Sequence, residues 1–110
     1  MWLNITQVKT YPAEAAHMVE ILSQEASLAP IQAARGFLRL YLVESTHTPG
    51  DLASITVWET PEDGQAYLAS PECLGIIDRI RGFLVTPLER HYYEVLIEAT
   101  NPIPSNIHDD

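Results

Sequence analysis

The 110-residue sequence has little cysteine, little basic charge and no long apolar run. Cys73 is its only cysteine, so no disulfide can form within the chain, and the CxxC spacings of metal sites are absent. Neighbouring Leu74, Ile76 and Ile77 favour a buried apolar role for this thiol. No apolar run approaches the ~20 residues that span a bilayer, and the amino terminus has no signal-peptide pattern. We therefore expect a cytoplasmic protein, and no motif predicts a metal or another cofactor.

Basic residues are scarce, because six Lys and Arg stand against fifteen Asp and Glu, for a formal net charge of -9. So few cations cannot form the basic stripe that binds a nucleic acid backbone, nor a patch that binds an anionic membrane. Nucleic acids and membranes are thus excluded as expected partners. The partners that we expect are a small-molecule ligand and a second copy of the chain. An apolar fraction of 46% at this length suits one domain with one core.

Hydrophobic periodicity predicts four strands and two helical regions. Alternating or branched residues predict strands over 2–9, 37–44, 52–59 and 88–97. Pro12 marks the start of the first helix, whose apolar residues recur at helical spacing from Ala15 to Ala29. Turn residues at 47–51 join the second and third strands into a hairpin.

The second helical region contains two helix starts, ten residues apart. Thr60-Pro61 and Ser70-Pro71 each place a capping hydroxyl before a proline at the first helical position. A proline ends the helix before it, so we expect a split helix. The resulting order is ferredoxin-like βαββαβ, an α+β fold with a four-stranded antiparallel sheet. We expect this domain over 1–98, followed by a loose tail over 99–110.

Strand register predicts which face of the sheet the helices cover. One face is purely apolar and carries Leu3, Ile5, Leu38, Leu40, Leu42, Ala53, Ile55 and Val57. The other face is mixed and carries Asn4, Thr6, Phe37, Arg39, Tyr41, Ser54, Thr56 and Trp58. We expect the helices on the apolar face. The mixed face is too aromatic to remain in water, so a second copy is expected to cover it and leave a part-polar cavity.

The segment ASITVWETPEDGQAYLASPE carries a family resemblance. Val57-Trp58-Glu59 ends a strand, and Ala66-Tyr67-Leu68 and Ser70-Pro71 follow a short capped helix. This pattern resembles the antibiotic biosynthesis monooxygenase domain, and the resemblance extends over most of the chain. It implies a homodimeric α+β barrel. Members of this family oxygenate polyketide quinols, degrade haem, isomerise small molecules or have no known activity, so the resemblance implies a fold more specifically than a reaction.

Three active sites known in the family are each incomplete in this sequence. The actinorhodin-type monooxygenases have an asparagine four residues before the tryptophan that matches Trp58 and a tyrosine six residues after it; these positions are Ser54 and Gly64. The haem-degrading branch has an iron-ligating histidine ten residues after a helix aromatic, and counting from Tyr67 gives Ile77, which cannot bind iron. The branch that processes autoinducer-2 has a histidine at the position that Tyr67 occupies in this sequence. We therefore expect no haem-degrading activity.

Candidate binding residues come from the mixed face. Trp58 and Tyr41 could stack on a planar substrate, although packing is the alternative for Trp58. Arg39 needs an anionic ligand or a structural ion pair with an acid such as Glu59 or Glu89. The residues predicted to bind substrate are Asn4, Arg39, Tyr41, Ser54 and Trp58.

The candidate catalytic residues are His91 and Tyr67. His91 is the only histidine within a predicted strand and could act as a general base, although solvent exposure or a dimer contact would also explain it. Tyr67 could donate a proton to a substrate oxygen or serve as a structural hydroxyl.

Two functions follow as expectations. The first is a cofactor-independent monooxygenase-like enzyme that acts on a small aromatic or enolisable substrate in the barrel cavity. In it His91 removes a proton, and Arg39 or Asn4 stabilises an enolate that reduces oxygen directly. The alternative is a non-catalytic dimeric module of the same fold that binds a small molecule, and a structural dimer with a filled barrel is a third possibility.

Overall fold

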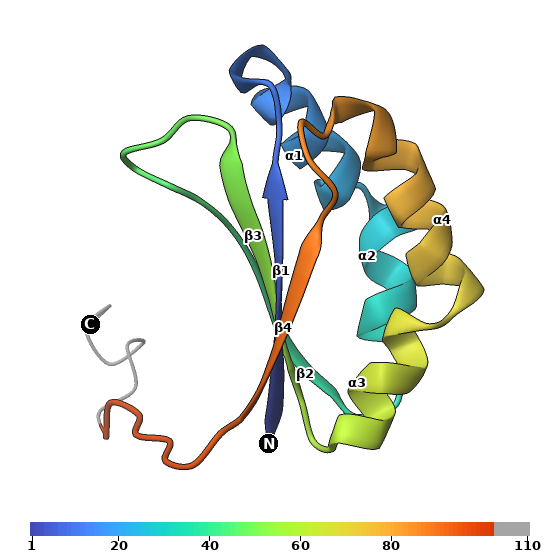
Figure 1. Cartoon of the computed structure of the whole chain (residues 1–110). Coiled ribbons are helices and arrows are strands. Elements are labelled where there is room, and N and C mark those ends of the chain that lie inside the picture. The colour runs from blue at the N-terminus through green and yellow to red at the C-terminus, as the bar shows by residue number, and fades with distance from the viewer. Residues whose placement is uncertain (103–110) are drawn as a thin grey trace, which may run out of the picture.

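The computed structural model of the chain, which describes residues 1–102, places every helix on one side of a single sheet (Figure 1). The four antiparallel strands run in the order β2-β3-β1-β4. Their bounds are β1 (Trp2–Lys9), β2 (Phe37–Glu44), β3 (Asp51–Trp58) and β4 (Glu89–Glu94). The predicted ferredoxin-like α+β fold is confirmed. β4 is shorter than predicted, because residues 95–102 are irregular.

The second helical region is split as predicted, into α3 (Pro61–Leu68) and α4 (Pro71–Ile80). The Thr60 hydroxyl accepts from the Asp63 N–H at 3.2 Å, and the Ser70 hydroxyl accepts from the Cys73 N–H at 3.2 Å. Both caps precede a proline at the start of the helix. Short 3-10 turns, Pro12–Glu14 and Arg81–Phe83, precede the first helix and follow α4.

The first helical region is also split, which the sequence analysis did not predict. It consists of α1 (Ala15–Ser23) and α2 (Glu25–Gln32), separated by Gln24 in an extended conformation. The Ser27 hydroxyl donates to the Ile21 carbonyl at 2.8 Å and so satisfies an acceptor that the break releases. The break rotates the buried face, so that Ser27 and Ile31 of α2 are buried whereas Ala29 is exposed.

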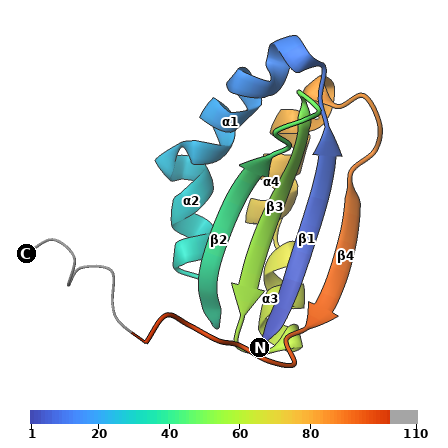
Figure 2. The ribbon, with the colours of Figure 1, turned by 90° about the vertical axis from the view of Figure 1, so that its left-hand side faces the viewer.

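The predicted orientation of β1 and β3 is wrong. Five residues expected opposite the helices lie beneath them, in a core cluster or lining the cavity there: Asn4, Thr6, Ser54, Thr56 and Trp58. Leu3, Ile5, Ala53, Ile55 and Val57 alternate with these and lie on the face that no helix covers (Figure 2). The prediction failed because it assumed that the more apolar face must be the covered one.

The orientation of β2 is mostly as predicted. Leu40 and Leu42 line the space beneath the helices, and Arg39 and Tyr41 lie on the opposite face. Between Phe37 and Arg39 the pairing with β3 shifts by one residue, so Leu38 is the extra residue of a β-bulge and is 40% exposed. The bulge lets Phe37 pack beneath the helices, where its ring meets Trp58 edge-on at 5.6 Å.

We define the open face by the outward residues of the four strands. They are Leu3, Ile5, Arg39, Tyr41, Val43, Ala53, Ile55, Val57, His91 and Tyr93. Figure 2 shows this side, with the helices behind the sheet. Most of these side chains are apolar, so the sheet presents a hydrophobic surface opposite its helices.

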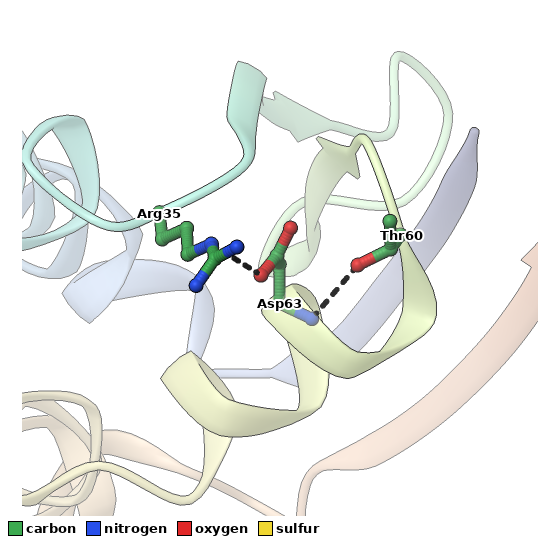
Figure 3. A network of polar contacts seen from close by, with 3 residues as sticks. All are labelled: Arg35, Thr60 and Asp63. Carbon is green, nitrogen blue, oxygen red and sulfur yellow. Dashed lines mark hydrogen bonds and ion pairs between the residues drawn. The ribbon is translucent and has the colours of Figure 1, made fainter.

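A polar network joins the start of α3 to the loop before β2 (Figure 3). Arg35 Nε lies 3.7 Å from a carboxylate oxygen of Asp63, the residue whose N–H is capped by Thr60. Gly36 adopts a positive φ of 76°, and a Cβ at this position would overlap the Asp63 carboxylate. These contacts position α3 over one end of the sheet.

Candidate functional site

A cavity of about 120 Å³ lies between the sheet and the helices. Apolar side chains from α1, α2 and α4 line the helix side, among them Leu22, Ile31 and Ile77. An engineered apolar cavity of roughly 150 Å³ binds benzene, so this space suits a ligand of about one ring. The volume therefore favours a small planar molecule over a polycyclic one.

The sheet side of the cavity contains polar side chains among the apolar Val8, Leu40 and Leu42. Asn4 pairs with Thr56 and Thr6 pairs with Ser54 across β1 and β3, and these four residues, which we call the polar patch, all line the cavity. Asn4 is 1% exposed; its amide nitrogen donates to the Thr6 hydroxyl at 3.0 Å. Its oxygen Oδ1 is buried and accepts no hydrogen bond from residues 1–102. An orphan acceptor in a cavity is available to a ligand that donates a hydrogen bond.

Arg90 of β4 reaches the same cavity next to the polar patch. Its Nη2 donates to the Cys73 sulfur at 3.8 Å, and its Nε is buried without a hydrogen-bond partner among residues 1–102. Burial raises the pKa of the Cys73 thiol, and the charge of Arg90 and its hydrogen bond offset part of that increase. The thiol is therefore a neutral neighbour of the guanidinium.

Tyr67 lies on α3 and lines the cavity, as expected for a residue that could meet a substrate. Burial, with smaller contributions from Cys73 and Glu72, raises the pKa of Tyr67 to about 12. The phenol is thus protonated throughout the physiological range. It can donate a hydrogen bond to a ligand oxygen but cannot serve as a base near neutral pH.

Trp58 is fully buried and is not part of the cavity wall. Its indole N–H donates to the Thr56 hydroxyl at 2.9 Å, and its ring lies 5.5 Å from the Tyr67 ring. Together with Phe37 these contacts place it in the core, in agreement with the packing alternative. Because Tyr41 lies on the opposite face, Trp58 and Tyr41 cannot stack on one ligand within a subunit.

Gly64 has a structural reason to lack a side chain. It lies against Trp2 and Trp58, so that a Cβ there would overlap the Trp2 ring and approach Trp58 Cδ1 to 3.0 Å. Trp2 is 6% exposed and stacks on Tyr92 at 5.3 Å. The tyrosine found here in actinorhodin-type monooxygenases would need the volume that Trp2 fills.

The remaining candidates lie on the open face, away from the cavity. Arg39 pairs with Glu98 at 3.5 Å, which matches the structural ion-pair alternative with a different acid from those considered. His91 lies 3.6 Å from Glu89, and Tyr41 is 52% exposed. Apart from Trp58, which lies in the core, the predicted site residues therefore form two groups. Asn4, Ser54 and Tyr67 meet at the cavity, whereas Arg39, Tyr41 and His91 lie on the other side of the sheet.

Sequence analysis missed Arg90 and Cys73 as cavity residues. Arg90 stands between Glu89 and His91 in a predicted strand and matches no motif, and a lone cysteine carries no motif either. The alternation of side chains along the strand could have identified Arg90, because Leu88 and Arg90 lie on the same face of the sheet and both line the cavity. That inference also needed the orientation of β1, because β4 pairs with β1, and the orientation predicted from the apolar pattern was wrong.

Two further features bear on the class of protein. Among residues 1–102 no group of three His, Cys, Asp or Glu side chains is placed to hold a metal ion. In the same part of the chain, no helix is long and apolar enough to cross a membrane.

Known structures with the same fold cover almost the whole chain. The protein Rv0793 of Mycobacterium tuberculosis is 20% identical, with a TM-score of 0.75 over 90% of this chain and 98% of its own. A candidate antibiotic biosynthesis monooxygenase from Deinococcus radiodurans is 23% identical, with a TM-score of 0.76 over 94% and 100%. A mutant of SnoaB, a cofactor-independent oxygenase from Streptomyces nogalater, is 19% identical, with a TM-score of 0.71 over 93% and 97%.

These likenesses establish the fold, and a family profile establishes the relationship. No curated protein matches the sequence. The profile of the antibiotic biosynthesis monooxygenases matches residues 1–79, which include the polar patch, Tyr67 and Cys73. Some members of this family are oxygenases that use no cofactor. The chain belongs to the antibiotic biosynthesis monooxygenase family.

Proposed function

We propose that this protein is a cofactor-independent monooxygenase-like enzyme that acts on a small phenolic or enolisable substrate in the cavity beneath its helices. The observation that carries the proposal is the orphan oxygen of Asn4, which is fully buried in a cavity of about 120 Å³. A buried polar group without a partner lowers stability, so its position next to an empty volume supports a ligand-binding role. Membership of the family supports oxygenation as the reaction.

The proposed reaction converts a substrate CH₂ group that flanks an enol or phenol into a carbonyl. Loss of a proton gives a carbanion or enolate that passes an electron to oxygen, and recombination forms a hydroperoxide at that carbon. Loss of water then leaves the carbonyl, so that one atom of O₂ enters the product and the other leaves as H₂O. Tyr67 donates a hydrogen bond to the substrate oxygen and stabilises the developing negative charge.

The base in this reaction is not His91 of the same subunit, because His91 lies on the open face. Among residues 1–102 the ionisable side chains that line the cavity are Tyr67, Cys73 and Arg90. The pKa values of Tyr67 and Cys73 are raised, so neither is a base at neutral pH. The substrate must therefore be acidic enough to ionise on binding, with water as the proton acceptor.

The second candidate is a dimeric module that binds a small molecule without turning it over. The separation of His91 from the cavity favours this function, because an enzyme that must deprotonate a weakly acidic substrate needs a base within hydrogen-bond reach. The polar patch, Tyr67 and Arg90 would then only orient and retain a ligand.

The proposed active form is a homodimer in which two open faces pack together as an α+β barrel. Leu3, Ile5, Ile55 and Val57 supply an apolar centre for this contact. Burying such a surface stabilises association by about 25 cal/mol per Å² before the cost of ordering. In this arrangement the two cavities face outward, one per subunit, unlike the shared cavity that the sequence predicted.

Oxygen consumption by the purified protein with single-ring and two-ring quinols tests the enzymatic proposal. We expect protein-dependent uptake of one O₂ per product, with Tyr67→Phe slower than the wild type. Native mass spectrometry of the freshly purified protein reports its assembly and any retained ligand. Thermal stabilisation by a quinol that causes no oxygen uptake would instead support the binding module.

A further inference from the structure

Arg90 carries a charge that nothing in the described chain compensates. No carboxylate of residues 1–102 lies within 4.0 Å of its guanidinium nitrogens, whereas Arg35, Arg39 and Arg81 each have an acidic partner within that distance. Arg79 also has no acidic partner in this part of the chain, but it donates to the Ser27 hydroxyl at 2.9 Å. Within residues 1–102, the Arg90 guanidinium makes a long hydrogen bond of 3.8 Å to the Cys73 sulfur. Its Nε is completely shielded and unpaired. Arg90 is half-buried, and a hydrogen-bond acceptor that enters the cavity would satisfy its shielded Nε.

The neighbours of Arg90 cannot supply that negative charge. The thiol of Cys73 and the phenol of Tyr67 face the cavity from α4 and α3, and both pKa values are raised, so both groups are neutral. Thr6, directly across on β1, is uncharged. The remaining cavity side chains are apolar or are neutral members of the polar patch.

Asn4 supplies a second and independent indication of the ligand. Asn4 pairs with Tyr92 and Thr6 pairs with Arg90, so Asn4 and Arg90 are diagonal neighbours on adjacent strands and both line the cavity. Diagonal neighbours have side chains that long residues can bridge, with Cα atoms about 7–8 Å apart. One offers an unpaired N–H donor with positive charge, and the other an unpaired, 1% exposed acceptor.

From this arrangement we infer that Arg90 selects a small oxyanion, a carboxylate, enolate or phenolate of about one ring that carries a neighbouring O–H or N–H. The anionic oxygen accepts from Arg90 Nε, and the donor group binds Asn4 Oδ1. This inference deepens the proposed function, on which it rests, by naming the charge and size of the substrate. It also accounts for ionisation of the substrate without a basic side chain, because the guanidinium lowers the pKa of an acid beside it.

Two isosteric pairs of ligands test the inference, 3-hydroxybenzoate against 3-hydroxybenzamide and anthranilate against anthranilamide, in which the anion and its amide both carry the O–H or N–H donor for Asn4 Oδ1. Each pair differs in charge and barely in shape. Calorimetry and thermal-shift assays with the full chain measure the affinities. In at least one pair, the wild type should bind the anion at least about tenfold more tightly than the amide, which is the difference expected for a hydrogen bond to a charged group. Arg90→Gln should lose that preference. The control Arg81→Gln changes an exposed arginine that pairs with Asp78 and should retain it.

A second variant keeps the test decisive if Arg90→Gln fails to fold. Asn4→Asp places a carboxylate beside Arg90 and should abolish anion binding in a folded protein. Equal affinity for anion and amide, an anion preference that survives in Arg90→Gln, or no binding of any of the four compounds would each overturn the inference. Oxygen uptake with neutral quinols would still test the proposed function separately, because that assay does not depend on the charge preference.

Discussion

The two faces of the sheet are both largely apolar, but they differ in the polar side chains that they carry. The face beneath the helices carries the polar patch and Arg90, whereas the open face carries Leu3, Ile5 and Ile55. A buried polar group without a partner and an apolar sheet face left in water both lower stability. The contrast therefore supports the proposals that the covered face binds a ligand and that the open face binds a partner.

The largest effect should follow a charge placed at the centre of the open face. Ile55→Asp should raise the dissociation constant of the dimer at least about 100-fold, because an unpaired carboxylate would be buried in the interface. Light scattering after size exclusion measures this change. Leu74→Asp, at a half-exposed position on α4, should leave the assembly unchanged. A monomeric wild-type protein would contradict the contrast between the faces.

The next effect concerns packing at the α3 end of the covered face. Gly64→Ala should lower the free energy of unfolding by about 1–3 kcal/mol, because the new methyl group overlaps Trp2. In Gly75→Ala the methyl group would meet nothing within 4 Å and should raise stability by up to about 1 kcal/mol, because alanine favours the helix. Urea denaturation of the two variants gives the comparison. Equal effects would show that Trp2 does not restrict this position.

A smaller effect should separate stability from ligand binding within the polar patch. Asn4→Leu removes the orphan oxygen and should raise the free energy of unfolding by about 1 kcal/mol while ligand binding is lost. Thr56→Val should instead lower stability by about 1–3 kcal/mol, because it leaves the Trp58 indole N–H without its acceptor. Denaturation and ligand-induced thermal shifts measure both quantities. Destabilisation by both variants would argue that Asn4 is a structural residue.

The smallest effect concerns the pH dependence of stability. The pKa of Tyr67 is about 12 in the folded protein and near 10 when unfolded, so above pH 10 the unfolded chain has lost a proton that the folded chain retains. Stability therefore falls as pH rises from about 10 to 12. Tyr67→Phe should lack this component, which we expect to be below about 1 kcal/mol because the side chain is only partly buried. Urea midpoints measured from about pH 10 to 12 test this expectation. Equal changes in the wild type and in Tyr67→Phe would contradict the raised pKa of Tyr67.

Local signals in the sequence were sufficient for most of the fold. The alternation over 2–9 and 37–44, and the Thr60-Pro61 and Ser70-Pro71 starts, each correspond to an observed element. These signals act within a few residues, so they do not depend on tertiary packing. The break at Gln24 was missed because it is stabilised by hydrogen bonds of Ser27 and not by a proline or glycine.

The site was predicted only in part, because periodicity identifies two faces without saying which one is covered. Apolarity was used to choose between them, and that criterion failed because the covered face contains Asn4, Thr6, Ser54 and Thr56. Asn4 and Ser54 were identified as polar residues of the mixed face, and Tyr67 was identified because it lies in the segment that resembles the family. Arg90 was missed because its role depends on the pairing of β4 with β1, which is a long-range contact.

The bulge at Leu38 bears on how far assembly can proceed. β2 is an edge strand, and a regular edge next to a partner could add strands from further molecules without limit. The register shift between Phe37 and Arg39 interrupts the regular ladder and increases the local twist of that edge. Beside its apolar open face, the protein thus carries on the adjoining edge a feature that opposes growth into fibrils.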